Sequence, residues 1–118
     1  MKNLKNEMLL ALSALPACTA EAFAREELPL PIIVIGEESG RVLAQADGEP
    51  YLEEYVIAAD VYAFSREELD DLAIQADQAL SALGFFRIYQ QDRYEEDAFA
   101  FRKALRYRGV IGGERIYQ

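Results

Sequence analysis

The stretch YVIAADVYAFSREELDDLAIQADQALSALG, residues 55–84, joins the longest strand pattern of the chain to its clearest helix. The strand becomes apolar on both faces, which is typical of a central strand that is covered on both sides. Ser65 and Glu68 form the S-x-x-E pattern of a capping box, and acidic residues fill the first turn. Leucines and alanines then recur at helical spacing up to Gly84. We therefore predict a strand over Tyr51–Phe64, followed by an amphipathic helix that ends at this glycine.

Weaker patterns flank this unit. Upstream, they indicate a helix ended by Pro16 and two short strands, at Asn3–Leu15, Ile32–Gly36 and Arg41–Ala46. The residues EESG and DGEP predict a turn after each of these two strands. Downstream, two strands joined by an acidic turn are predicted at Phe85–Tyr94 and Ala98–Arg108.

The segment between Pro16 and the first strand has two interpretations. Residues 21–28 fit either a short helix with Thr19 as its N-cap or an irregular arm. Pro29 and Pro31 then favour an extended chain. The lone Cys18 has no second cysteine for a disulfide, and we expect it to be a small buried apolar side chain.

The order of elements predicts an α+β fold with two helices packed on a largely antiparallel five-stranded sheet, in the order α-β-β-β-α-β-β. The 118 residues fit a single domain. We divide it into an N-terminal helix and arm (1–31), an α+β core (32–111) and a tail (112–118). No apolar run is long enough for a membrane helix, so we expect no membrane contact.

Composition disfavours several classes of enzyme. The chain has no histidine, so Ser-His-Asp and Cys-His catalytic arrangements and histidine-ligated metal sites are absent. Its glycines form no phosphate-binding loop. A small metal-dependent enzyme that uses Asp60 with Glu53 or Glu54 remains an alternative, but no lysine follows these acids at the spacing of a metal nuclease. We expect no catalytic residue, no metal and no cofactor.

Charge is distributed unevenly along the chain. Residues 1–97 hold seven basic and twenty acidic side chains, whereas residues 98–118 hold five basic and one acidic, within a net charge of −9. On the last predicted strand, Arg102, Arg106 and Arg108 share one face with alanines. Arginine suits bidentate pairing with carboxylates, whereas the acidic remainder of the chain disfavours a phosphate backbone. We expect no readout of nucleic acid sequence.

Two partners for these arginines are open. Asp60 is flanked by apolar neighbours, and we expect it to form an ion pair with an arginine of the last strand. Alternatively, acidic residues of a second copy face the arginines, and the candidates lie in the first turns of the long helix: Glu67, Glu68, Asp70 and Asp71. Acidic surfaces of a second copy are the better match for these arginines, and ordinary solvated arginines are the remaining interpretation.

Two segments, EEYVIAADVYAFSREELDDLAIQADQALSALGFFRI and DRYEEDAFAFRKALRYRGVI, resemble the small tail terminator, or tail completion, proteins of long-tailed bacteriophages and prophages. The shared pattern is a DVYA strand, a capped helix that ends in LGF, and a closing hairpin with an acidic turn. The likeness extends over Ile32–Ile111.

The resemblance implies a structural function. Such proteins form a ring, commonly a hexamer, that caps the tail tube and joins it to the head. The implied partners are other copies of the chain, the tail tube protein and head completion or connector proteins. The implied location is the bacterial cytoplasm during assembly and then the head-proximal end of the virion tail. By position, residues 37–50 match a mobile loop that orders on assembly, with Glu37, Glu38, Arg41, Asp47 and Glu49 as its charged residues. An acidic inhibitor that mimics DNA is the alternative, and the basic last strand disfavours it.

Overall fold

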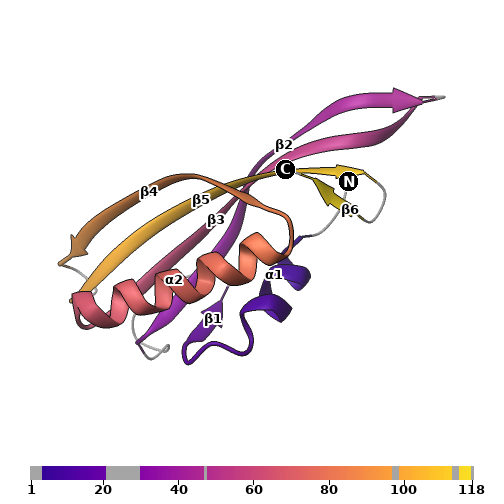
Figure 1. Cartoon of the computed structure of the whole chain (residues 1–118). Coiled ribbons are helices and arrows are strands. Elements are labelled where there is room, and N and C mark those ends of the chain that lie inside the picture. The colour runs from indigo at the N-terminus through magenta and orange to yellow at the C-terminus, as the bar shows by residue number, and fades with distance from the viewer. Residues whose placement is uncertain (1–3, 21–29, 47, 97–98, 113–114, 118) are drawn as a thin grey trace.

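The computed structural model describes residues 4–20, 30–46, 48–96, 99–112 and 115–117 (Figure 1). The elements follow in the order α1 (Lys5–Leu12), β1 (Cys18–Ala20), β2 (Ile32–Ala46), β3 (Glu49–Ala63), α2 (Arg66–Ala82), β4 (Phe86–Glu95), β5 (Ala100–Gly112) and β6 (Arg115–Tyr117). The predicted α+β class is confirmed, and the described residues contain the two predicted helices.

The sheet has the order β1-β2-β3-β5-β4. Its four long strands, β2, β3, β5 and β4, are antiparallel to their neighbours. Short β1 pairs parallel to β2, and short β6 pairs with β5. The predicted count of five strands is therefore not confirmed. Two of the predicted strands form the single strand β2, and the short strands β1 and β6 were not predicted.

The long strand β3 is central, as predicted, with β2 on one side and β5 on the other. Its alternate residues Tyr55, Ile57, Ala59, Val61 and Ala63 are buried and belong to the main core. Both helices lie on this face of the sheet (Figure 1). Each strand therefore directs one set of side chains toward the helices and the other set toward the opposite face.

Strand β2 corrects the prediction of two short strands separated by a turn at EESG. It is one 15-residue strand, and residues 37–40 lie within it. The register against β3 shifts between Glu37 and Ser39, so Glu38 occupies a bulge. A bulge accommodates an extra residue without ending the strand, and glycines inside a strand often mark one. A β-carbon on Gly40 would lie 2.9 Å from the ring of Tyr55, so this glycine permits close packing rather than a turn.

The second predicted turn, DGEP, is a tight connection in which Ala46 pairs with Glu49. Gly48 has φ of 80°, a conformation that glycine adopts without strain. Pro50 lies within β3 rather than in the turn. Among the described strands, residues 49–52 of β3 pair only with β2, and this end of the two strands extends past the rest of the sheet as a hairpin arm (Figure 1).

Helix α2 confirms the capping signals. The Ser65 hydroxyl accepts a hydrogen bond from the backbone N–H of Glu68 at 3.2 Å. Gly84 follows the C-cap with φ of 108°. The N–H of Gly84 donates to Ser81, and the N–H of Phe85 donates to Leu80. This is a Schellman motif, and it is completed by an apolar pair because Phe85 and Leu80 are both buried.

Helix α1 is shorter than the predicted Asn3–Leu15. It ends at Leu12, and the Ser13 hydroxyl donates to the carbonyl of Leu10 at 2.7 Å. Leu4, Met8 and Leu12 are fully buried, as their helical spacing predicts. Residues 21–28, the predicted short helix or arm, lie outside the described residues, and Thr19 lies in β1 rather than at a helix start. Among the described helices, none has the length and apolarity to span a membrane.

Candidate functional site

The face of β5 opposite the helices carries the predicted arginine ladder. Leu105 and Tyr107 belong to the main core. Because side chains alternate along a strand, Arg102, Arg106 and Arg108 point to the other face. The predicted face of alanines and arginines is confirmed from Ala100 onward. Phe99 precedes the strand, with a φ of 51° and a side chain that is 75% exposed.

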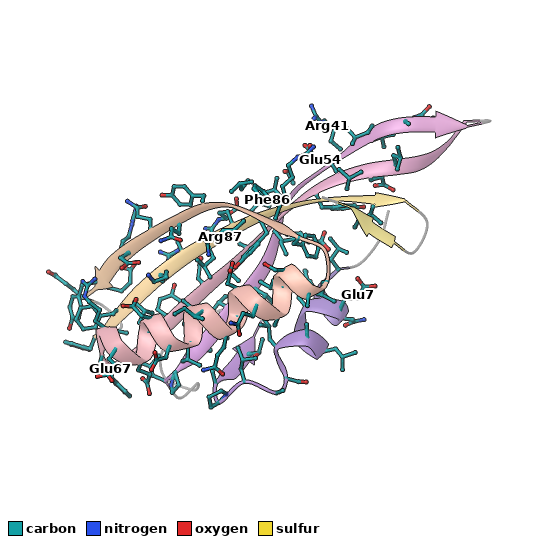
Figure 2. All side chains as sticks on the ribbon, viewed as in Figure 1. Glu7, Arg41, Glu54, Glu67, Phe86 and Arg87 are labelled. Atoms are coloured by element: carbon teal, nitrogen blue, oxygen red, sulfur yellow. The ribbon has the colours of Figure 1, made fainter. Side chains whose placement is uncertain are left out.

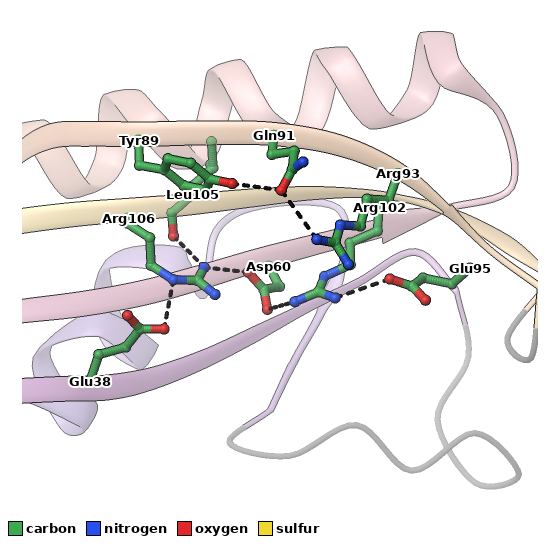
Figure 3. A network of polar contacts seen from close by, with 9 residues as sticks. All are labelled: Glu38, Asp60, Tyr89, Gln91, Arg93, Glu95, Arg102, Leu105 and Arg106. Atoms are coloured by element: carbon green, nitrogen blue, oxygen red, sulfur yellow. Dashed lines mark hydrogen bonds and ion pairs between the residues drawn. The ribbon is translucent and has the colours of Figure 1, made fainter.

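Asp60 lies between two of these arginines (Figure 3). One carboxylate oxygen lies 2.7 Å from Arg102 Nη2 and the other lies 2.6 Å from Arg106 Nη1. The Asp60 side chain is only 13% exposed. The predicted ion pair between Asp60 and the last strand is therefore confirmed, with two arginines rather than one.

Each of the two arginines also has a second acidic partner. Arg102 Nη1 lies 3.0 Å from Glu95 on β4, and Arg106 Nε lies 2.7 Å from Glu38 in the β2 bulge. Burial alone would lower the pKa of Arg102, but its hydrogen bonds to Glu95 and Asp60 raise it overall. These contacts connect all four long strands, and the guanidinium group of Arg102 stays ionised.

A second group lies where the hairpin arm leaves the sheet. Arg108 Nε lies 2.6 Å from Glu54, and Arg41 Nη2 lies 3.2 Å from the other oxygen of this carboxylate. Figure 2 shows Arg41 and Glu54 next to each other at the base of the arm. Together, the two groups place four arginines against four carboxylates, so these side chains have no net charge. We call all eight side chains the arginine network: Glu38, Arg41, Glu54, Asp60, Glu95, Arg102, Arg106 and Arg108.

The hydrogen bond from Arg108, together with the charge of Arg41, holds the pKa of Glu54 below its ordinary value of 4.5. A carboxylate whose pKa is lower in the folded state stabilises the protein above its unfolded pKa, and this contribution is lost as the pH falls through the folded pKa. As the pH falls below about 4.5, we expect the free energy of unfolding to decrease less in Glu54→Gln than in wild type. Urea titrations of both proteins over a series of acidic pH values measure it, and parallel pH profiles would contradict it.

Polar side chains on the helix side of the sheet also pair within the chain. Lys103 Nζ lies 3.1 Å from Asp70 on α2 and 3.0 Å from Asp92 on β4. Lys103 therefore pairs with two acids on the helix side, although its charge lies on the apolar face of β5. Buried Tyr107 donates a hydrogen bond of 2.7 Å to Asp77, which also pairs with Arg87. These contacts attach α2 to β4 and β5.

The two predicted interface patches lie on opposite faces of the sheet. The arginines lie on the face away from the helices, whereas Glu67, Glu68, Asp70 and Asp71 lie on α2. Asp70 pairs with Lys103, while Glu67 and Asp71 are exposed. A contact between the two patches would join the helix side of one copy to the opposite side of another. The acids of α2 would then compete with the carboxylates of the arginine network for the same arginines. Their role in a subunit interface stays a prediction.

The charged residues of the predicted mobile loop have several separate positions. Glu37 accepts a hydrogen bond of 3.0 Å from the N–H of Leu4, at the start of α1. Glu38 and Arg41 belong to the arginine network. Glu49 begins β3, and Asp47 lies outside the described residues. In this structure the segment is part of a paired hairpin, and its ordering on assembly stays a prediction.

Sequence reasoning did not predict Glu38 and Glu95 as partners of the arginines. Glu38 reaches Arg106 from the bulge, and Glu95 ends β4 beside Ala100 of β5. The short turn between the last two predicted strands could have indicated the pairing of Glu95 with Arg102, because a short turn brings the ends of its two strands together. Among the described residues, no three cysteine, aspartate or glutamate side chains are grouped in a way that could hold a metal ion.

Comparisons with known proteins show similarity in structure only. No family model and no curated protein sequence matches the chain. A chain in the virion of the native gene transfer agent particle is similar with a TM-score of 0.54 and 14% identity, over 90% of this chain and 84% of that chain. The gp17 protein of bacteriophage SPP1 is similar with a TM-score of 0.53 and 15% identity, over 89% and 86%. The fold is therefore shared with these two proteins over most of each chain.

Proposed function

We propose that this protein is a structural component of a phage or phage-derived particle. The observation that supports this most is the shared fold, which covers 90% of the chain and is found in a chain of a gene transfer agent virion. At 14–15% identity, the likeness itself extends only to the fold. The tail-protein pattern in residues 32–111 is independent support because it was identified from sequence alone.

The chemistry of the described surface supports a role without catalysis. Asp60 and Glu54, the acids considered for a metal-dependent enzyme, are bound to arginines at 2.6–2.7 Å. A guanidinium group already occupies the position where a cation would bind. The neutral arginine network also lacks the continuous row of carboxylates that a DNA mimic needs.

In its finer form, the proposal is a tail terminator or tail completion protein. Copies of the chain form a ring, a hexamer by resemblance, at the head-proximal end of the tail. The ring caps the tail tube and presents a surface to head completion or connector proteins. Assembly takes place in the bacterial cytoplasm.

Particles from a host that carries the gene test this proposal. We expect mass spectrometry to detect the chain in purified particles. We expect deletion of the gene to leave heads and tails unjoined, or tails of irregular length, in electron micrographs. Particles that lack the chain, or a deletion strain that assembles normal particles, would rule out the structural role. Expression of the gene from a plasmid provides the control by restoring normal particles.

A further inference from the structure

Strand β4 is an outer strand of the sheet with an exposed apolar surface. It pairs with β5 on one side, and residues 86–94 are all exposed. Four large side chains lie on it, with exposed fractions of 58% for Phe86, 49% for Ile88, 47% for Tyr89 and 53% for Tyr94. Figure 2 shows Phe86 on this strand, away from the helices. An outer strand presents unpaired backbone N–H and C=O groups to any further strand.

The charges on β4 do little to protect this edge. Proteins commonly block exposed edges with proline, with unpaired charges or with β-bulges. Strand β4 contains no proline, and its one register shift against β5 lies between Arg87 and Tyr89, so residues 89–95 pair regularly. Its Arg87 pairs with Asp77 of α2 at 3.0 Å, and its Asp92 pairs with Lys103 of β5 at 3.0 Å. These charges are directed toward the chain's own helix and neighbouring strand rather than outward along the edge.

At the opposite edge of the sheet, the described strands cover only part of the length of β2. Strand β1 pairs only with Ile32–Val34 of β2. Beyond these residues, no other strand in the described part of the chain pairs with the outer side of β2. This free part of β2 carries Val42 and Leu43, each 43% exposed.

We propose that β4 of one copy pairs in antiparallel orientation with the free part of β2 of the next copy. This inference rests on the proposed function, since it supplies the contact by which copies would form a ring. The four long strands alternate in direction, so β2 and β4 run oppositely. When β4 of one copy lies beside β2 of the next, the antiparallel alternation of strands therefore continues from one sheet into the other.

Apolar side chains are exposed on both edges. The exposed Arg93 of β4 adds a positive charge, and Glu38 in the β2 bulge, 46% exposed beside Arg106, adds a negative one. Ile88 and Tyr89 on one edge match Val42 and Leu43 on the other. The contact joins two different patches, so it is heterologous and can close into a ring. A symmetric β4–β4 dimer would leave the β2 edge open.

Two lysine substitutions test the pairing. Ile88→Lys places a charge on the β4 edge, and Leu43→Lys places one on the β2 edge; both side chains are exposed, so the fold should persist. Ile74→Lys is the matched control, because Ile74 is 59% exposed on α2. We expect sedimentation to show wild type and Ile74→Lys larger than a monomer, and both edge variants as monomers. Circular dichroism checks folding.

Mixing the two edge variants makes the test specific. The Ile88→Lys copy keeps its β2 edge and the Leu43→Lys copy keeps its β4 edge, so one intact contact can form. We expect the mixture to give dimers and nothing larger. Association of Leu43→Lys alone would show a symmetric β4 contact and overturn the proposal.

Three other results would also overturn the pairing. The wild-type chain could stay monomeric at its highest soluble concentration, or Ile88→Lys could associate as wild type does. The third is a loss of association in Ile74→Lys as large as in the edge variants. Charge reversal at exposed Glu67 and Asp71 should leave the mass unchanged. If it abolishes association, the acidic face of α2 is the contact instead. If the β4–β2 pairing is wrong, the chain can still be detected in purified particles. Failure of this inference is therefore distinguishable from failure of the proposed function.

Discussion

We expect Phe85→Ala to lower the free energy of unfolding by about 3–5 kcal/mol, the usual cost of removing a buried phenylalanine side chain. Phe85 is 1% exposed and belongs to the main core with Leu80. It also completes the Schellman motif at the end of α2, because its N–H donates to the Leu80 carbonyl. The substitution therefore leaves a cavity and removes the apolar contact that fixes how the chain turns from α2 into β4.

Phe86 provides a matched control in the next position. The same change there removes a side chain that is 58% exposed on β4, and we expect a loss of less than about 1 kcal/mol. Urea denaturation followed by circular dichroism gives both values, provided that the slope of unfolding free energy against urea is unchanged. Equal losses in the two variants would show that Phe85 does not pack as described. The pair also bears on association, since the Phe86 variant alters the β4 edge while leaving the core intact.

The helix α2 could be predicted from sequence because its signals are local. Ser65, Glu68 and Gly84 determine its ends through backbone hydrogen bonds within one turn, and its leucines repeat at the helical period. The same holds for β3, whose apolar run identified it as central. In contrast, EESG predicted a turn at residues 37–40. These residues lie inside β2 because of a bulge against β3, and Gly40 packs against the ring of Tyr55; both are tertiary contacts that local patterns do not reveal.

The arginine network was predictable in part for the same reason. Alternation along β5 placed Arg102, Arg106 and Arg108 on one face, and the apolar neighbours of Asp60 marked it as a paired carboxylate. The other acids could not be assigned, because Glu38 reaches Arg106 only through the bulge of β2. The charge imbalance between the two parts of the chain suggested contact between copies. Within one copy, however, the arginines already pair with carboxylates of β2, β3 and β4.

The second large effect is expected at Asp60. We expect Asp60→Ala to lower the free energy of unfolding by about 3 kcal/mol, since removal of one partner from a buried ion pair leaves charge without compensation. The Asp60 side chain is 13% exposed and its two arginines are 22% and 19% exposed. The lower end of the usual range applies because Glu95 and Glu38 still bind these arginines. An exposed pair gives the control: Arg41, 68% exposed beside Glu54, should cost at most about 1 kcal/mol when changed to alanine.

A double-mutant cycle separates the ion pairs from simple loss of packing. When Arg102 and Arg106 are both replaced by methionine, the carboxylate of Asp60 is left without its two partners. In this background Asp60→Ala should cost much less than in wild type, or even stabilise the protein, because it removes an unpaired buried charge. Urea denaturation of the four proteins measures the coupling, and added salt should change it little because the charges are partly buried. Equal costs in both backgrounds would mean that Asp60 stabilises the fold through packing alone. A large coupling would instead show that the carboxylate of β3 and the arginines of β5 depend on each other, so the basic strand is stabilised by the acids of its own chain.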